Sequence, residues 1–169
     1  SGEILDDEIK WSKFSSAEWS PDSSGFFYRK YLQPDGEELL DLNNSPKLMF
    51  HVIGTDQTDD QIIIWNKNDP LISNSIAVSD DGQYKVLYTE KGTDERNLIS
   101  ISRYEDKEFI SIIDEFVANY TFIDSEDNYL WFLTDDMAPN RKVVRLDFNN
   151  INLGFEEIIP ETASSIRSV

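Results

Sequence analysis

A strand, an acidic turn and a second strand recur three times along this sequence, and this repeat limits what the chain can fold into. In the middle copy, residues 77–88, the serine and two aspartates at 79–81 can fold their side-chain oxygens onto nearby backbone N–H groups. Gly82 can take the positive φ that closes the turn, and the residues after it alternate with the period of two that is typical of a β-strand. An earlier copy lies at 18–28 and a degraded copy at 121–132. Repetition of this kind predicts a repeat architecture.

The same alternation predicts three units of four strands each. We expect a lead-in segment at 1–13, units at 14–70, 71–115 and 116–160, and the start of a further unit or a linker at 161–169. The expected strands lie at 14–19, 25–31, 47–53 and 61–65, then at 75–78, 83–89, 96–104 and 108–113, and finally at 119–123, 128–134, 141–148 and 155–159. The polar segment 33–46 is expected to be a loop.

Four-stranded antiparallel meanders of this length are typical of the blades of a β-propeller, in which each sheet covers the apolar face of its neighbour. The sequence therefore predicts an all-β fold of about three propeller blades. Propellers typically close with four to eight blades, and an open stack exposes the outer faces of its first and last sheets. We therefore expect this chain to be part of a longer protein.

The charge balance excludes several classes of partner. The chain has 169 residues, of which 15 are basic and 33 acidic, and its formal net charge is −18. Such a charge repels the phosphate backbone of nucleic acids and anionic membrane surfaces. We expect no nucleic-acid partner and no membrane partner.

Cysteine usage and the start of the chain bear on the compartment. The chain has no cysteine, which excludes disulfides and thiolate chemistry and favours a reducing environment. No apolar run approaches the length of a membrane span, and residues 1–7 lack the basic and apolar regions of a signal peptide. These features predict a cytoplasmic location.

Seven short motifs occur in a fixed order along the chain. They are Lys13-Phe14-Ser15, the hairpin from Trp19 to Tyr28, Lys47-Leu48 leading into His51-Val52-Ile53-Gly54-Thr55-Asp56-Gln57, Val78-Ser79-Asp80-Asp81-Gly82, Gly92-Thr93-Asp94, Asn140-Arg141 and Ile159-Pro160-Glu161. Together they resemble the propeller domain of the prolyl oligopeptidases, or prolyl endopeptidases, a family of serine peptidases. The resemblance extends over nearly the whole chain from about Leu5.

The resemblance implies a seven-bladed propeller that covers an α/β-hydrolase domain of the same polypeptide. That hydrolase would cleave short peptides on the carboxyl side of proline, and the propeller would exclude folded proteins from its active site. This chain would supply three internal blades. Its expected partners are therefore the catalytic domain of the parent chain and short peptides.

The resemblance also implies that a few propeller side chains line the distal part of the substrate pocket. By position these are Phe14, Ser73 and Thr93. Phe14 matches the family in type, whereas larger or sulfur-bearing side chains are usual where Ser73 and Thr93 stand. Glu90 stands where a basic residue is common, which would favour basic peptide side chains at the distal site. Simple packing is the competing interpretation for each of the three contacts.

No catalytic residue, metal site or cofactor is expected in this chain. The peptidase nucleophile requires a Gly-x-Ser-x-Gly elbow, which the sequence lacks. The only histidine, His51, falls in a predicted strand, and we expect a structural histidine that backbone or water satisfies. Residues 124–128 resemble the start of a calcium loop, but Tyr129 stands where glycine is needed and Asp135 where glutamate is needed. Solvated turns explain these carboxylates better, and the chain alone should not hydrolyse peptides.

Large aromatic side chains fall at predicted strand positions, where a core between blades is favoured over a surface that stacks on a ligand. They are Trp19, Trp65, Trp131, Phe26, Phe27, Tyr84 and Tyr88.

Three functional hypotheses follow. The first is a partial propeller of a prolyl oligopeptidase that gates a catalytic domain absent from this chain. The second is a stand-alone interaction module that completes its ring by self-association. The third is an independent acidic metal-binding domain, whose melting temperature would rise with calcium.

Overall fold

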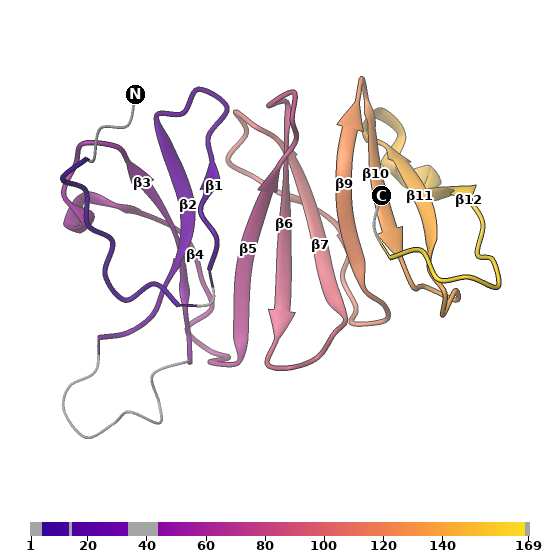
Figure 1. The fold of residues 1–169 in the computed structure, drawn as a ribbon, viewed down its shortest axis with the longest axis horizontal. Helices are drawn as coiled ribbons and strands as arrows, with labels where there is room; N and C mark the ends of the chain where they lie inside the picture. The colour runs from indigo at the N-terminus through magenta and orange to yellow at the C-terminus, as the bar shows by residue number, and fades with distance from the viewer. Residues whose placement is uncertain (1–4, 14, 34–43, 168–169) are drawn as a thin grey trace. The chain divides into compact units, whose positions relative to one another are not determined.

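The computed structural model describes residues 5–13, 15–33 and 44–167. In these ranges the chain forms three four-stranded sheets, each built from consecutive strands (Figure 1). Neighbouring strands pair antiparallel, as in β2 with β3 and β10 with β11. The predicted all-β meanders are confirmed. Phe14 lies outside the described residues, as does most of the expected loop at 33–46.

Most strand bounds follow the predicted ranges closely, but the strand predicted at 14–19 is limited to two residues, because residues 15–17 are not in a strand. The first sheet contains β1 (Glu18–Trp19), β2 (Gly25–Lys30), β3 (Lys47–Val52) and β4 (Gln61–Trp65). The second contains β5 (Ile72–Val78), β6 (Tyr84–Lys91), β7 (Asn97–Arg103) and β8 (Ile110–Ile113). The third contains β9 (Tyr120–Glu126), β10 (Tyr129–Thr134), β11 (Lys142–Asp147) and β12 (Phe155–Ile159). Two short 3-10 helices, η1 (Gln57–Asp59) and η2 (Phe148–Leu153), precede β4 and β12.

The chain divides into two compact units, Ser1–Ile76 and Ala77–Val169, and the boundary falls within β5. The blade boundaries expected near residues 70, 115 and 160 stay predictions. No helix in the described ranges has the length and hydrophobicity needed to cross a bilayer.

Two of the three predicted turns are closed by the same set of hydrogen bonds. Before β2, Ser20 Oγ donates to Asp22 Oδ1 at 2.7 Å and accepts from the Gly25 backbone N–H at 3.1 Å. Before β6, Ser79 Oγ donates to Asp81 Oδ1 at 2.6 Å and accepts from the Tyr84 N–H at 3.0 Å. The serine therefore replaces a ladder partner at the start of each second strand.

The third predicted turn was placed wrongly. The sequence analysis put residues 124–127 in the turn, but β9 continues to Glu126 and pairs it with Tyr129. Only two residues connect the strands, and the first, Asp127, has a φ of 56°. The Ser-x-Asp spacing is present in this copy too, as Ser125-Glu126-Asp127, but Ser125 lies in β9 and its Oγ donates to Asp81 Oδ1 at 3.2 Å instead. A two-residue connection with positive φ fits the twist of a hairpin.

The core of the second unit lies between the second and third sheets. Alternate residues of β6, β7, β10 and β11 form one buried cluster, together with the first residue of β9 and an alanine shortly before it. Its members are Tyr84, Val86, Ile99, Ile101, Ala118, Tyr120, Leu130, Phe132, Val144 and Leu146. Two sheets thus bury their apolar faces against each other, as the propeller prediction requires.

The predicted aromatic core is confirmed in part. Tyr84 is fully buried in this cluster and Tyr88 packs against it, while Phe27 is buried in the first unit. The prediction for Trp19 was wrong, because its side chain is 49% exposed. Trp19 belongs to a two-residue strand, and its ring contacts Phe26 edge-on at 5.2 Å between centroids while the rest faces solvent.

Gly25 lies where the backbone of β2 comes closest to β3, and this predicts a large effect of substitution. A Cβ at this position would collide with the His51 carbonyl oxygen and lie 2.7 Å from Cζ of Phe50. We expect Gly25→Ala to lower the free energy of unfolding by about 2 to 3 kcal/mol, measured by urea denaturation. Gly54→Asn is the control, because nothing lies within 4 Å of its Cβ and asparagine tolerates its φ of +83°. Equal losses in the two variants would contradict the steric explanation.

The turn at Asp22 predicts an acid-dependent contribution to stability. Hydrogen bonds from Ser20 and Ser24 lower the pKa of Asp22 from 3.8 to about 2. A carboxyl whose pKa is lowered by folding stabilises the chain above its unfolded pKa, and this contribution is lost as the pH falls towards 2. We expect Asp22→Asn to lower the urea midpoint at pH 7, and the gap from the parent chain to close between about pH 4 and pH 2. Asp114→Asn, an exposed change outside this turn, should leave the urea midpoint at pH 7 nearly unchanged. A pH-independent gap for Asp22→Asn would refute the assignment.

Candidate functional site

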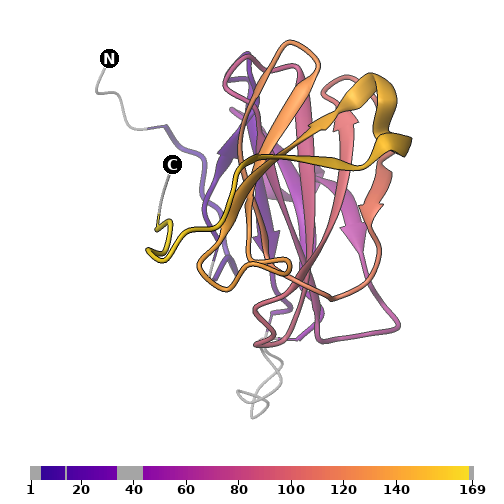
Figure 2. The ribbon, with the colours of Figure 1, turned by 90° about the vertical axis from the view of Figure 1, so that its right-hand side faces the viewer.

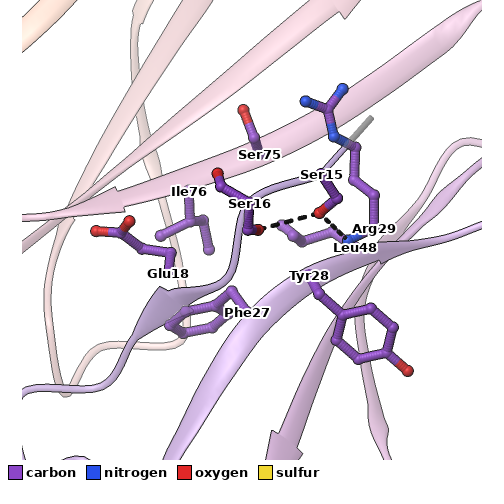
Figure 3. Close-up of a pocket in the computed structure, with 9 residues that line it drawn as sticks. All are labelled: Ser15, Ser16, Glu18, Phe27, Tyr28, Arg29, Leu48, Ser75 and Ile76. Atoms are coloured by element: carbon purple, nitrogen blue, oxygen red, sulfur yellow. Dashed lines mark hydrogen bonds between the residues drawn. The ribbon is translucent and has the colours of Figure 1, made fainter. Parts of the chain in front are cut away.

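Arg29, which contacts the predicted site residue Ser73, lines a small cavity of the first unit (Figure 3). The cavity has a volume of about 20 Å³, which is room for about one water molecule and too little for a peptide side chain. Its lining comes from the segment before β1, from β1, β2 and β3, and from the middle of β5, and Ser73 itself does not belong to it. The lining residues are Ser15, Ser16, Glu18, Phe27, Tyr28, Arg29, Leu48, Ser75 and Ile76.

Arg29 links the elements around this cavity. Its backbone N–H donates to Ser15 Oγ at 2.9 Å, and its Nη1 donates to Ser73 Oγ at 3.4 Å. Figure 3 shows the Glu18 carboxylate on the far side of the cavity from the Arg29 guanidinium. The strand β2 thus places a half-buried positive charge next to a predicted substrate contact.

Arg29 was not among the predicted site residues. Its position in the sequence could have indicated it, because a charged residue there follows three aromatic residues within a predicted strand. A guanidinium recognises carboxylates, often through two parallel hydrogen bonds, and repels cationic side chains. The predicted preference of the distal site for basic peptide side chains stays a prediction, and Arg29 argues against it.

The three predicted substrate contacts lie in different parts of the chain. Phe14 lies outside the described residues, although the next residue, Ser15, lines the cavity. Ser73 lies in β5, is half-buried and contacts Arg29. Thr93 belongs to the second unit, where it is exposed in the turn between β6 and β7. The structure therefore joins Ser15 and Ser73 through Arg29, and the substrate roles of all three stay predictions.

His51 has a structural partner of a kind that the sequence analysis did not expect. Its Nδ1 lies 2.7 Å from Asp60 Oδ1, and the two side chains are 1% and 0% exposed. The second oxygen of Asp60 accepts a hydrogen bond from the Tyr28 hydroxyl at 2.6 Å. The expected backbone or water partner was wrong, because a buried carboxylate satisfies this nitrogen. Burial, followed by the hydrogen bond to Asp60, raises the pKa of Tyr28, so the hydroxyl keeps the proton that it donates.

An Asp–His pair is two thirds of a catalytic triad, but this pair lacks a nucleophile. In the described part of the chain no hydroxyl hydrogen-bonds to His51 Nε2, which is buried without a hydrogen-bond partner. The Oδ1 atom of Asp7 lies 4.0 Å from this nitrogen, which is too far for a hydrogen bond. Without an adjacent serine or cysteine the pair cannot activate a nucleophile. Its role is to hold β3, the end of η1 and β2 together.

The lead-in segment is fastened to the first sheet close to this pair. Both carboxylate oxygens of Asp7 accept from the Gly54 backbone N–H, at 3.1 and 3.0 Å. The Gln57 side-chain amide pairs with the backbone of Lys10 in both directions, at 3.1 and 3.0 Å. The side-chain amide of Gln57 thereby pairs with Lys10 as a backbone amide of a neighbouring strand would.

The described residues do not have the geometry that a calcium site would require. Asp124 and Ser125 lie in β9 instead of a loop, and Asp124 Oδ1 accepts from the Asp80 backbone N–H at 3.0 Å. Among the residues that the structure describes, no three metal-ligating side chains come together.

Comparison with known proteins places this geometry in a family. The family model of the prolyl oligopeptidase N-terminal beta-propeller domain matches residues 1–169. Prolyl oligopeptidase A of Amanita bisporigera is 34% identical over 168 residues, which cover 93% of this chain and 22% of that protein. Prolyl endopeptidase of Elizabethkingia meningoseptica is 30% identical over 164 residues, which cover 96% of this chain and 23% of that protein. The chain thus spans less than a quarter of the length of these relatives.

Solved structures agree with this placement. Prolyl oligopeptidase B from Galerina marginata, bound to a 25mer macrocyclization substrate, matches with a TM-score of 0.87 and 28% identity over 94% of this chain and 23% of that one. Oligopeptidase B from Leishmania major has a TM-score of 0.69 at 16% identity over 95% of this chain and 22% of that one, which shows a shared fold. The chain belongs to the prolyl oligopeptidase family, in which it matches the N-terminal β-propeller domain.

The buried pair predicts a strong dependence of stability on Asp60. Removing its carboxylate leaves His51 Nδ1 and the Tyr28 hydroxyl buried without their partner. We expect Asp60→Ala to lower the free energy of unfolding by about 3 kcal/mol, measured by urea denaturation at pH 7. Asp59→Asn, an exposed change one residue away, should leave the unfolding midpoint nearly unchanged. A loss below about 1 kcal/mol for Asp60→Ala would show that the pair contributes little.

Proposed function

We propose that this chain is part of the propeller of a prolyl oligopeptidase-type serine endopeptidase. In this proposal it restricts access of peptides to an α/β-hydrolase domain that the same polypeptide supplies. The observation that carries the proposal is the family match over residues 1–169, combined with coverage of only 22–23% of the relatives' length. The catalytic chemistry then belongs to the part of the protein outside these residues.

The absence of catalytic groups in the sequence supports this division of labour. The chain has no Gly-x-Ser-x-Gly elbow, and its only histidine is committed to Asp60. A peptidase of this type needs a serine on a strained elbow, a histidine base and an orienting acid. These residues alone are therefore expected to be inactive towards peptides.

Propeller architecture supports the proposed gating role. Four-stranded sheets arranged radially surround a central channel, and their buried faces make the ring stiff. By strand order, β1, β5 and β9 are the first strands of their sheets, which is the position next to the axis in a propeller. A narrow, stiff channel admits short extended peptides and excludes folded proteins.

The finer assignments belong to the same proposal. Phe14, Ser73 and Thr93 would contact the distal part of a bound peptide, and Arg29 would add a positive charge beside Ser73. The absence of cysteine favours a cytoplasmic location.

The proposal is tested by expressing the complete reading frame that contains these 169 residues. We expect cleavage of a short peptide after proline, abolished when the serine of the downstream Gly-x-Ser-x-Gly elbow is replaced by alanine. The same proline-containing sequence placed inside a folded protein should resist cleavage, and the 169-residue chain alone should be inactive. A complete protein without an elbow, or without cleavage after proline, would end the peptidase assignment. Equal cleavage of the short peptide and the folded protein would end the gating role.

A further inference from the structure

A row of basic and aromatic side chains crosses one end of the first sheet. Lys30 in β2 lies directly opposite Lys47 in β3, and Lys47 lies directly opposite Trp65 in β4. Residues directly opposite each other in antiparallel strands carry their side chains on the same face of the sheet. Lys67 follows two residues after β4 and approaches the same indole. We call Lys47, Trp65 and Lys67 the basic row.

The indole of Trp65 is held in place and carries two cations. The Lys47 and Lys67 ammonium nitrogens lie 4.1 and 4.4 Å from the ring centroid. The indole Nε1 donates to Ser45 Oγ at 3.0 Å, and the Ser45 N–H donates to the Pro70 carbonyl at 2.7 Å. The half-buried ring is therefore a fixed platform with two positive charges on it.

This arrangement concentrates positive charge that the described residues do not neutralise. Neither Lys47 nor Lys67 forms an ion pair with any residue in the described ranges, and the same holds for Lys30. Like charges directly opposite each other in a sheet are destabilising. The Lys47 and Lys67 ammonium groups, which both contact the Trp65 ring, also repel each other. Acidic residues outnumber basic ones by 33 to 15 in this chain, so unpaired lysines that gather at one place need an explanation. An external anion at this place would relieve the repulsion.

Lys30 is not counted in the basic row, because it also borders a cavity lined by Asp56 and the lead-in residues. Hydrogen bonds from Thr58 lower the pKa of Asp56, and the charge of Lys30 adds to this effect. Part of its charge is therefore balanced within the chain.

We propose that the basic row binds an acidic segment of another polypeptide. The net charge of −18 repels long polyanions such as nucleic acids and anionic membranes, whereas a short segment meets mainly the local charge. Both ammonium groups lie close to one indole ring, and alternate carboxylates of an extended segment, about 7 Å apart, can each pair with one of them. This proposal does not depend on the peptidase assignment.

The experiment measures binding of hexaglutamate, as the acidic probe, to the 169-residue chain at low salt by isothermal titration calorimetry. We expect binding that weakens as salt is added and that falls about tenfold in the Lys47→Gln/Lys67→Gln variant. The matched control is Lys13→Gln/Lys107→Gln, which changes the net charge by the same amount at two exposed lysines elsewhere. It should bind within about twofold of the parent chain. Lys67→Gln alone lies outside the strands and should keep the fold, so it serves where the double variant is unstable.

Several results would overturn the proposal. They are no binding of hexaglutamate, an equal loss in the control variant, and equal binding of hexalysine. Equally tight binding of a short single-stranded DNA would overturn the assignment to polypeptide. The titration with hexaglutamate is then repeated with the complete protein. Loss of binding there would show that the rest of the same polypeptide covers the basic row, and would overturn the assignment to another polypeptide.

Discussion

The structure depends on the burial of one apolar sheet face against another. In the second unit, alternate residues of β6 and β7, such as Val86 and Ile101, meet alternate residues of β10 and β11, such as Phe132 and Leu146. A four-stranded meander cannot remove such a face from water by itself, so each sheet needs a neighbour. This requirement explains why the strand pattern repeats, and why the relatives carry these sheets within much longer chains.

Polar side chains complete the structure where the apolar faces leave backbone groups unpaired. Asn97 accepts from the Tyr120 N–H and donates to the Tyr120 carbonyl, both at 2.9 Å, and so joins β7 to the start of β9. Ser20 and Ser79 start β2 and β6 in the same way through their hydroxyls. The buried carboxylate of Asp60 does this work for His51 and Tyr28. Several of the side chains in these arrangements are acidic, so part of the negative charge of the chain serves its structure.

The surroundings of the predicted substrate contacts hold no catalytic machinery in the described part of the chain. Arg29 contacts both Ser15 and Ser73 and lines a cavity that is too small for a substrate, and the Asp–His pair has no nucleophile within the described residues. These observations fit the proposed function, in which this chain shapes access while another domain breaks the bond. In that proposal Arg29 would add a positive charge that the family resemblance did not indicate.

Most of the strand positions and two of the turns could be predicted from the sequence, because strand periodicity and turn residues are local properties of the chain, and the ordered motifs indicated the family. Local patterns could not predict contacts between distant residues, and the Ser-x-Asp pattern at Ser125 did not form the expected turn. Asp60 lies nine residues from His51 and 32 from Tyr28, and Arg29 lies 44 from Ser73, so only the assembled sheets bring these groups together. The exposure of Trp19 and the hairpin at Asp127 were likewise decided by tertiary structure. The burial of a side chain and the register of a strand depend on neighbouring strands and sheets, and the local sequence pattern does not encode these neighbours.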